Sequence, residues 1–406
     1  MFKEKNITDK IKTQTKVPLG FRAGGIHCGI KKSRKDLALI ISELPATAAA
    51  VFTLNKVQAA PVLVSKNNLI GSETFRAIVV NSGNANACTG ERGFKDAVTM
   101  MNVTADVLGV NPQEVFVAST GVIGEPLPIQ KIIDGIQIIA DMTSARDFSD
   151  AAEAIITTDT FAKTYSSSFE INGKDVTIYG MAKGSGMIHP NMATMLGFVL
   201  TDAAIEKNIF QTILSDTNKK TFNRIVVDGD TSTNDMVIAL ANGASGATIS
   251  PGTASYKIFE EQFTKVLKKL ALDIVLDGEG ATKLVEITVD GALSDSDAEK
   301  AARTIALSPL VKTAIHGEDA NWGRIIAAVG YSGIEFDPAK FEIIINSMQI
   351  LNQNYIVALP TVEANQTLKP QFIDLQIKLN AGNGKATCWT CDFSEEYVKI
   401  NGSYRT

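Results

Sequence analysis

The residue best suited to unusual chemistry in this chain is Thr194, which follows the small residue Ala193 and opens an apolar run that ends at Leu200. The hydroxyl of such a threonine can attack the preceding carbonyl, shift the chain from nitrogen to oxygen and leave an ester that water cleaves. The cut gives an N-terminal threonine whose α-amine, with an ordinary pKa of ~8, can accept a proton from the adjacent hydroxyl. One residue would then hold both nucleophile and base.

An Ala-Thr pair alone does not establish this chemistry, because a threonine that merely begins a strand is far commoner. The neighbouring sequence adds polar loops rich in glycine, each directly following an apolar run, and loops at strand ends are where functional groups gather. Taken singly, each such loop is more often an ordinary turn. The loops are residues 81–88, 119–124, 183–186, 228–235 and 277–280.

Other familiar chemistries lack their motifs. No glycine-rich loop has the spacing of a phosphate or dinucleotide site, so nucleotide binding has no support. The three histidines are far apart in the sequence and show no metal-ligand spacing. Cys388 and Cys391 have a C-x-x-C spacing but fall in a predicted strand, and no second pair completes a zinc site. We interpret these cysteines as small buried side chains and predict no metal and no cofactor.

The elements that must position Thr194 mix helices with short strands. Periodicity predicts helices at 94–108, 127–142, 203–214, 256–275 and 297–307, and strands at 37–42, 75–81, 115–118 and 194–200. Asn172-Gly173 predicts a hairpin within residues 166–181, and a second antiparallel pair is expected between 372–379 and 385–393. These patterns indicate an α+β fold of mixed or antiparallel sheets with packed helices. They locate no domain boundary.

Composition narrows the class of protein. The 406 residues carry 39 basic and 44 acidic side chains, a formal charge of −5, which argues against nucleic acid as a partner. No apolar run is long enough to span a membrane, and residues 1–14 contain no apolar stretch typical of a signal peptide. We therefore expect a cytoplasmic enzyme.

Residues 183–196 resemble the signature of the ornithine acetyltransferase (glutamate N-acetyltransferase) family without a departure. The resemblance covers nearly the whole chain. Leu200 stands where a polar residue is expected, and Cys388 is outside the family pattern. Further matching segments, in the family's order, are 21–29, 77–82, 119–125, 157–160, 228–235, 277–283, 319–324 and 400–406.

The resemblance implies that the bond between Ala193 and Thr194 is cut autocatalytically. The products would be an α chain, residues 1–193, and a β chain, residues 194–406, with Thr194 as nucleophile. It also implies an oxyanion hole formed by Thr120 and Gly121. The substrate-binding set that it implies is Thr157, Lys183, Thr194, Glu279, Asn401 and Thr406.

The implied reaction moves an acetyl group from N2-acetylornithine to glutamate through an acetyl-Thr194 ester, within arginine biosynthesis. Charge suggests that Lys183 binds the donor's α-carboxylate and that Glu279 binds its side-chain ammonium. Whether acetyl-CoA is also accepted as a donor stays open. The family further implies a heterotetramer of two α and two β chains.

Two alternatives remain at this stage. One is an N-terminal-nucleophile amidase or aminopeptidase, which would share the self-cleavage but use water as acceptor. The other is a non-enzymatic binding protein whose glycine loops build a ligand cleft. We also predict that the C-terminus is ordered and lies near Thr194, anchored by a strand in which Val398 and Ile400 share one face.

Overall fold

The computed structural model describes residues 15–189 and 195–403. These residues form two compact units. The larger unit runs to Asn223 and resumes over Asp230–Ile274, and the smaller unit comprises Arg224–Gly229 and the chain from Val275 onward. Both units combine a mixed sheet with packed helices, which confirms the predicted α+β class. No simple boundary exists in the sequence because the chain enters the smaller unit twice.

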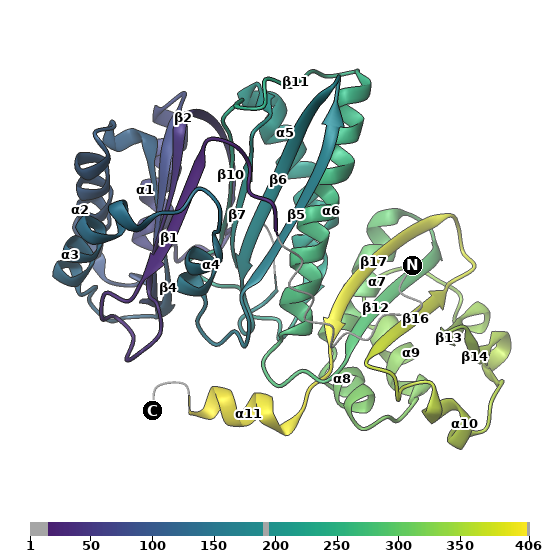
Figure 1. The fold of residues 1–406 in the computed structure, drawn as a ribbon. Coiled ribbons are helices and arrows are strands. Elements are labelled where there is room, and N and C mark those ends of the chain that lie inside the picture. Colours follow the sequence, from purple (N-terminus) through teal and green to yellow (C-terminus); the bar gives the residue numbers. More distant parts are fainter. Residues whose placement is uncertain (1–14, 190–194, 404–406) are drawn as a thin grey trace. The chain divides into compact units, whose positions relative to one another are not determined.

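The larger unit is built on an eight-stranded sheet with the order β4-β3-β2-β10-β7-β6-β5, to which β1 is added by pairing with β2 (Figure 1). Its central strands β10 and β7 are parallel, and β7 and β6 are antiparallel. The strands are β1 (Phe21–Ile26), β2 (Leu37–Phe52), β3 (Phe75–Asn84), β4 (Val115–Val122), β5 (Lys163–Ile171), β6 (Lys174–Lys183), β7 (Leu196–Thr201) and β10 (Met236–Ala241), with a separate pair β8 (Ala204–Ile205) and β11 (Thr248–Ile249).

Helices cover this sheet because its strands are apolar on both faces. Along β2, Leu37 and Leu39 belong to a core cluster with residues of α1, α2 and α3, whereas Ala38 and Ile40 belong to a second cluster with residues of α4. The helices are α1 (Ala60–Gly71), α2 (Gly90–Leu108), α3 (Ile129–Ile139), α4 (Ser149–Ile155), α5 (Lys207–Lys220) and α6 (Ala254–Leu276), with short 3-10 turns η1 (Pro112–Glu114), η2 (Ala140–Met142) and η3 (Phe222–Arg224).

The smaller unit is built on a seven-stranded sheet of order β15-β14-β13-β16-β12-β17-β9. Its strands are β9 (Ile225–Val226), β12 (Leu284–Ala292), β13 (Glu342–Ile345), β14 (Met348–Asn352), β15 (Ile356–Val357), β16 (Phe372–Lys378) and β17 (Gly384–Cys391). Its helices are α7 (Asp295–Leu307), α8 (Pro309–His316), α9 (Trp322–Gly330), α10 (Thr361–Gln366) and α11 (Glu395–Gly402), with 3-10 turns η4 (Pro338–Lys340) and η5 (Gln353–Tyr355).

The predicted hairpin at Asn172-Gly173 is confirmed: β5 and β6 pair antiparallel, and both turn residues have positive φ. Two other predictions are wrong. β16 and β17 do not pair with each other, since β12 lies between them, parallel to β16 and antiparallel to β17. The expected strand around Val398 and Ile400 is helix α11, and Val398 is 70% exposed.

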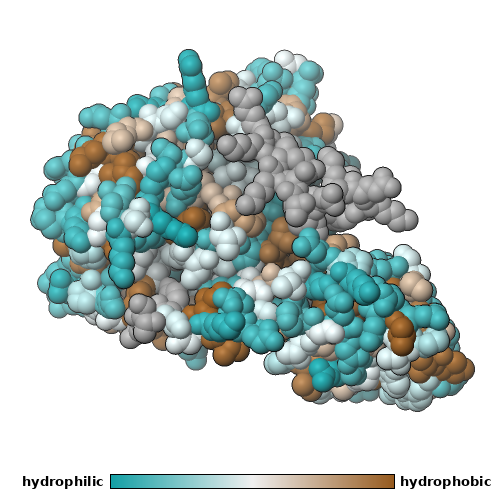
Figure 2. Space-filling model, turned by 60° about the horizontal axis from the view of Figure 1, so that its bottom comes forward, coloured by the Kyte–Doolittle hydropathy of each residue, from teal (hydrophilic) through white to brown (hydrophobic). Residues whose placement is uncertain are grey.

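The face shown in Figure 2 carries hydrophobic residues in small groups between hydrophilic and neutral ones, as expected of a surface in contact with water. Within residues 15–189 and 195–403, no helix combines the length and the apolar character needed to cross a bilayer.

Candidate active site

Strand β7 begins two residues after the predicted nucleophile Thr194. Thr194 and Ala193 lie outside the described residues, but Met195 and all of β7 are described and buried. The carbonyl of Met195 accepts a hydrogen bond from the backbone N–H of Met236 at 3.0 Å, and Leu196 is paired in register with Lys183 on β6. The residue that follows Thr194 is therefore held inside the sheet, between β10 and β6.

The predicted oxyanion pair lies at the end of β4. Thr120 and Gly121 are in register with Ser82 and Gly83 of the parallel neighbour β3. Gly121 has a φ of +132°, and a Cβ placed there would lie 2.3 Å from the carbonyl carbon of Gly83. Only glycine fits this position, because both the backbone conformation and the close approach of β3 exclude a side chain.

Lys183 is brought to this pair. It ends β6, is 9% exposed, and its Nζ donates to Thr120 Oγ1 at 3.4 Å. A buried ammonium and a threonine hydroxyl thus meet at the edge of the sheet that also carries the start of β7. This places two of the predicted site residues in direct contact.

Thr157 is connected to the same edge through Asp159, a residue that the sequence reasoning did not single out. The carboxylate of Asp159 accepts from the backbone N–H of Thr157 at 2.9 Å and from that of Gly184 at 2.7 Å. It also accepts from Lys163 Nζ at 2.6 Å. Burial acts to raise the pKa of Asp159, but the charges of Lys163 and Lys183 and the hydrogen bonds hold it well below its ordinary value.

Two further residues at this edge were given no individual role in the sequence analysis. Asn234 is buried, and its Nδ2 donates to the carbonyls of Ser119 at 2.9 Å and Ala85 at 2.5 Å, which ties the segment before β10 to β4 and to the end of β3. Asp235 is also buried, and burial raises its pKa well above the ordinary value despite hydrogen bonds from Ser232 and the charge of Lys183. The polar segment 228–235 contained both residues and was the available signal.

The smaller unit holds the other two described residues of the predicted set. Glu279 is 6% exposed, and its Oε2 accepts from Asn401 Nδ2 at 2.8 Å. Glu279 follows the end of α6 and Asn401 lies in the last turn of α11. The two residues therefore meet although they are far apart in sequence. Thr406 lies outside the described residues.

The loop of Glu279 is held against the C-terminal segment at several points. Gly280 has a φ of +71°, and a Cβ there would lie 2.6 Å from the backbone nitrogen of Tyr397 in α11. The carbonyl of Gly280 accepts from Ser394 Oγ at 2.6 Å. Asp392, just after β17, accepts from the backbone N–H groups of Thr282 and Lys283 at 2.7 and 2.8 Å. These contacts fix Glu279 relative to Asn401.

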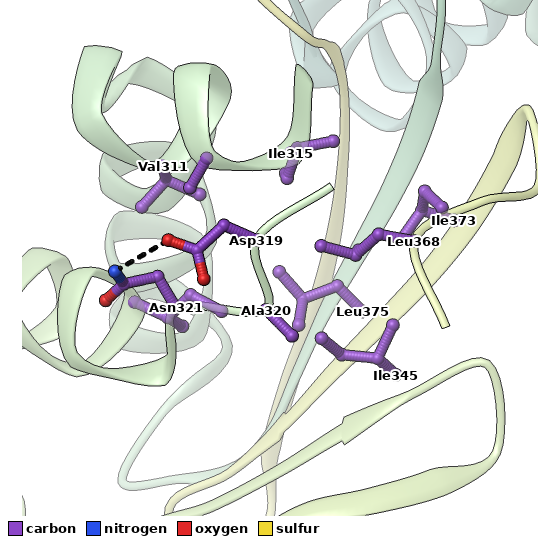
Figure 3. Close-up of a pocket in the computed structure, with 11 residues that line it drawn as sticks. Val311, Ile315, Asp319, Ala320, Asn321, Ile345, Leu368, Ile373 and Leu375 are labelled. Carbon is purple, nitrogen blue, oxygen red and sulfur yellow. Dashed lines mark hydrogen bonds between the residues drawn. The ribbon is translucent and has the colours of Figure 1, made fainter. Parts of the chain in front are cut away.

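A small apolar pocket in the smaller unit is separate from these residues (Figure 3). Residues of α8, β13 and β16 line it, and at its rim Asp319 Oδ2 accepts from Asn321 Nδ2 at 3.0 Å. Asn321 also caps α9 by accepting from the backbone N–H of Arg324 at 3.2 Å. The family-like segment 319–324 thus has a structural role here, and none of the predicted site residues lines the pocket.

The cysteines Cys388 and Cys391 are both fully buried on β17, which confirms the sequence interpretation. Burial raises the pKa of both thiols. Among the described residues, no group of three histidine, cysteine, aspartate or glutamate side chains could hold a metal ion.

Comparison with known proteins gives matches along the whole chain. The family model of the ArgJ family matches residues 22–406. The arginine biosynthesis bifunctional protein ArgJ of Symbiobacterium thermophilum is 50% identical over 393 residues, which cover 96% of this chain and 98% of that protein. The protein of the same name from Bacillus subtilis is 46% identical over 398 residues, 98% of each chain.

Two solved structures also match in part. A chain of the bifunctional protein ArgJ from Bacillus halodurans is 49% identical, and the match covers 43% of this chain and 92% of that chain with a TM-score of 0.41. A chain of ornithine acetyltransferase from Mycobacterium tuberculosis, solved in complex with ornithine, is 39% identical, with 45% and 97% covered and a TM-score of 0.40. With its family model matched over residues 22–406 and with relatives of up to 50% identity, this chain belongs to the ArgJ family.

Proposed function

We infer that this chain is an acyltransferase of arginine biosynthesis that moves the acetyl group of N2-acetylornithine to glutamate. The relatives, whose alignments cover 96% or more of this chain, are named as arginine biosynthesis proteins, and the related structure from Mycobacterium tuberculosis holds ornithine. The observation that carries the inference is the contact of the buried Lys183 side chain with Thr120, because a charge suited to a carboxylate would then lie beside the proposed oxyanion donor.

The proposed reaction begins with Thr194, freed by cleavage after Ala193. Its hydroxyl attacks the acetyl carbonyl while its α-amine takes the proton, and ornithine leaves with its amine protonated. Thr120 and Gly121 stabilise the charge that develops on the carbonyl oxygen. The amine of glutamate then attacks the acetyl-Thr194 ester and restores the hydroxyl. One amide is exchanged for another, so the reaction as written uses no nucleotide and no cofactor.

The substrate groups are assigned by charge. Lys183 would bind the α-carboxylate that both amino acids share, with Thr157 beside it. Glu279, held by Asn401 at 2.8 Å, would bind the side-chain ammonium of ornithine. Thr406 completes the proposed set. A second donor, acetyl-CoA, is proposed because the relatives are named bifunctional. A cytoplasmic location and a tetramer of two α and two β chains also remain proposals.

The decisive assay incubates the purified enzyme with N2-acetylornithine, with and without glutamate, and measures N-acetylglutamate, ornithine and acetate. We expect ornithine release to depend on glutamate and to match the N-acetylglutamate formed. Release of ornithine and acetate without glutamate would instead support an N-terminal-nucleophile amidase. A parallel reaction with acetyl-CoA and glutamate tests the second donor.

A further inference from the structure

Asp159 contacts two separate segments of the candidate substrate site with one carboxylate. Its side chain is fully buried in the turn between α4 and β5. One oxygen, Oδ2, accepts from the N–H of Thr157 at 2.9 Å. The other, Oδ1, accepts from the N–H of Gly184 at 2.7 Å, directly after Lys183. The loop of Thr157 and the end of β6 are thereby held at a fixed separation.

Several charged side chains surround this carboxylate. Lys163 pairs with Asp159 at 2.6 Å, and Lys183 also acts on it electrostatically. Burial raises the pKa of Asp235, the other carboxyl group on which Lys183 acts. Lys31 lies close enough to interact with both Lys183 and Asp159, and burial lowers its pKa to about 8. Lys31, Lys163 and Lys183 therefore all act on Asp159, while the buried Asp36 also acts on Lys31.

We propose that Asp159 is a positioning residue for carboxylate recognition: it fixes Thr157 and Lys183 and neutralises Lys163, so that the charge of Lys183 is left for the substrate's α-carboxylate. The proposal rests on the proposed function, in which Lys183 binds that carboxylate. A buried cation that no carboxylate pairs with directly is a costly arrangement. A substrate anion relieves that cost, which favours substrates that bear one.

Loss of the negative charge has a specific consequence. In Asp159→Asn, the side chain that pairs with Lys163 at 2.6 Å and that interacts electrostatically with Lys183 loses its negative charge. The amide nitrogen of the new side chain would also face one of the backbone donors that now bind the carboxylate.

The test compares wild-type enzyme and Asp159→Asn with two acetyl donors. With N2-acetylornithine, we expect KM to rise roughly ten- to a hundredfold, by analogy with the loss of an outer-shell residue that orients a ligand. With N-acetyl-1,4-diaminobutane, which lacks the α-carboxylate, wild type and variant should have similar KM values. Equal KM changes for both donors would overturn the proposal.

Asp202→Asn is the matched control. Asp202 is also a buried carboxylate that accepts two backbone N–H bonds, from Leu19 at 3.0 Å and Thr177 at 2.9 Å, but it follows the far end of β7. The Asp202→Asn variant should have a lower Tm than the wild type but no donor-dependent change in KM. If Asp159→Asn does not fold, the same KM comparison with Lys163→Gln tests the proposal instead.

In Lys163→Gln the carboxylate is left to pair with Lys183. KM should again rise for N2-acetylornithine and not for the analogue. Unchanged KM values in Lys163→Gln would overturn the proposal. Absence of acetyl transfer in the wild-type enzyme would instead refute the proposed function.

Discussion

Thr120 and Lys183 illustrate how single residues combine at this site. The hydroxyl of Thr120 lies on β4, and the ammonium 3.4 Å away lies on β6, so the sheet brings two donors of different charge to one edge. A hydroxyl suits an oxygen that becomes charged only during the reaction, whereas an ammonium suits a group that is charged throughout. The two residues should therefore affect different kinetic constants.

Thr120→Ala should lower kcat by about a hundredfold or more while changing KM little, because the lost donor acts on the transition state. Steady-state kinetics with N2-acetylornithine and glutamate measure this. A variant with raised KM and unchanged kcat would reassign Thr120 to ordinary substrate binding.

Thr194→Ala should abolish both chain cleavage and acetyl transfer, since alanine has no hydroxyl to attack either carbonyl. Thr194→Ser should retain part of both activities, because the hydroxyl remains but its rotamer is less restricted. Intact-mass measurement after purification follows the cleavage between Ala193 and Thr194. An alanine variant that is still cut at this bond would indicate an external protease.

The sequence predicted site residues from motifs but did not reveal the burial and the contacts of their side chains. Gly121 and Lys183 were predicted from the resemblance, and the structure shows a backbone that admits only glycine at Gly121 and a buried charge at Lys183. Asp159 and Asn234 lay within quoted segments without an assigned role, because their importance comes from backbone groups of other strands. Contacts of that kind depend on the tertiary fold and leave no spacing in the sequence.

At the scale of elements, local signals were sufficient where one turn decides the pairing. Asn172-Gly173 specified the β5–β6 hairpin because the turn conformation itself sets the register. The same logic failed for β16 and β17, since β12 from earlier in the chain lies between them. It failed again at α11, where Val398 and Ile400 alternate with a lysine but the segment is helical, with Glu395 and Glu396 in its first turn.

The docking of α11 gives an element-scale prediction. In Gly280→Ala, the new Cβ would meet the backbone nitrogen of Tyr397 at 2.6 Å, so α11 must move and carry Asn401 away from Glu279. We expect a higher KM for N2-acetylornithine than in the wild type. Kinetic assays of the purified variant measure it.

Gly333→Ala is the control for that experiment. Gly333 has a φ of +76° in the same unit, and a Cβ there would meet nothing within 4 Å. Both substitutions carry a backbone strain of roughly 1 kcal/mol, but only Gly280→Ala displaces a helix. Equal KM values in the two variants would show that the position of α11 does not matter for substrate binding.

At the scale of the whole molecule, the predicted cut falls inside one sheet. Strands β1 to β6 precede Thr194, whereas β7 and β10 follow it and lie between β2 and β6. The adjacent strands β7 and β10 are thus flanked on both sides by strands of the first fragment, since β10 pairs with β2 and β7 pairs with β6. Separating the fragments would require the central sheet of the larger unit to be broken.

We therefore predict that the fragments 1–193 and 194–406 stay together after cleavage at every concentration at which the enzyme is folded. Size-exclusion chromatography at falling protein concentration, followed by denaturing electrophoresis, should show both fragments in each enzyme peak in equal amounts. Recovery of either fragment alone in a folded state would contradict the strand order.

The interleaved sheet would also make the predicted cleavage a one-way event. Before the cut, denatured chains refold by a first-order process, since all strands belong to one polypeptide. After the cut, two fragments must first find each other, and the yield of refolding becomes dependent on their concentration. Unpaired strands exposed in the meantime favour aggregation. The lifetime of the mature enzyme is then governed by how slowly it unfolds, not by how well it refolds.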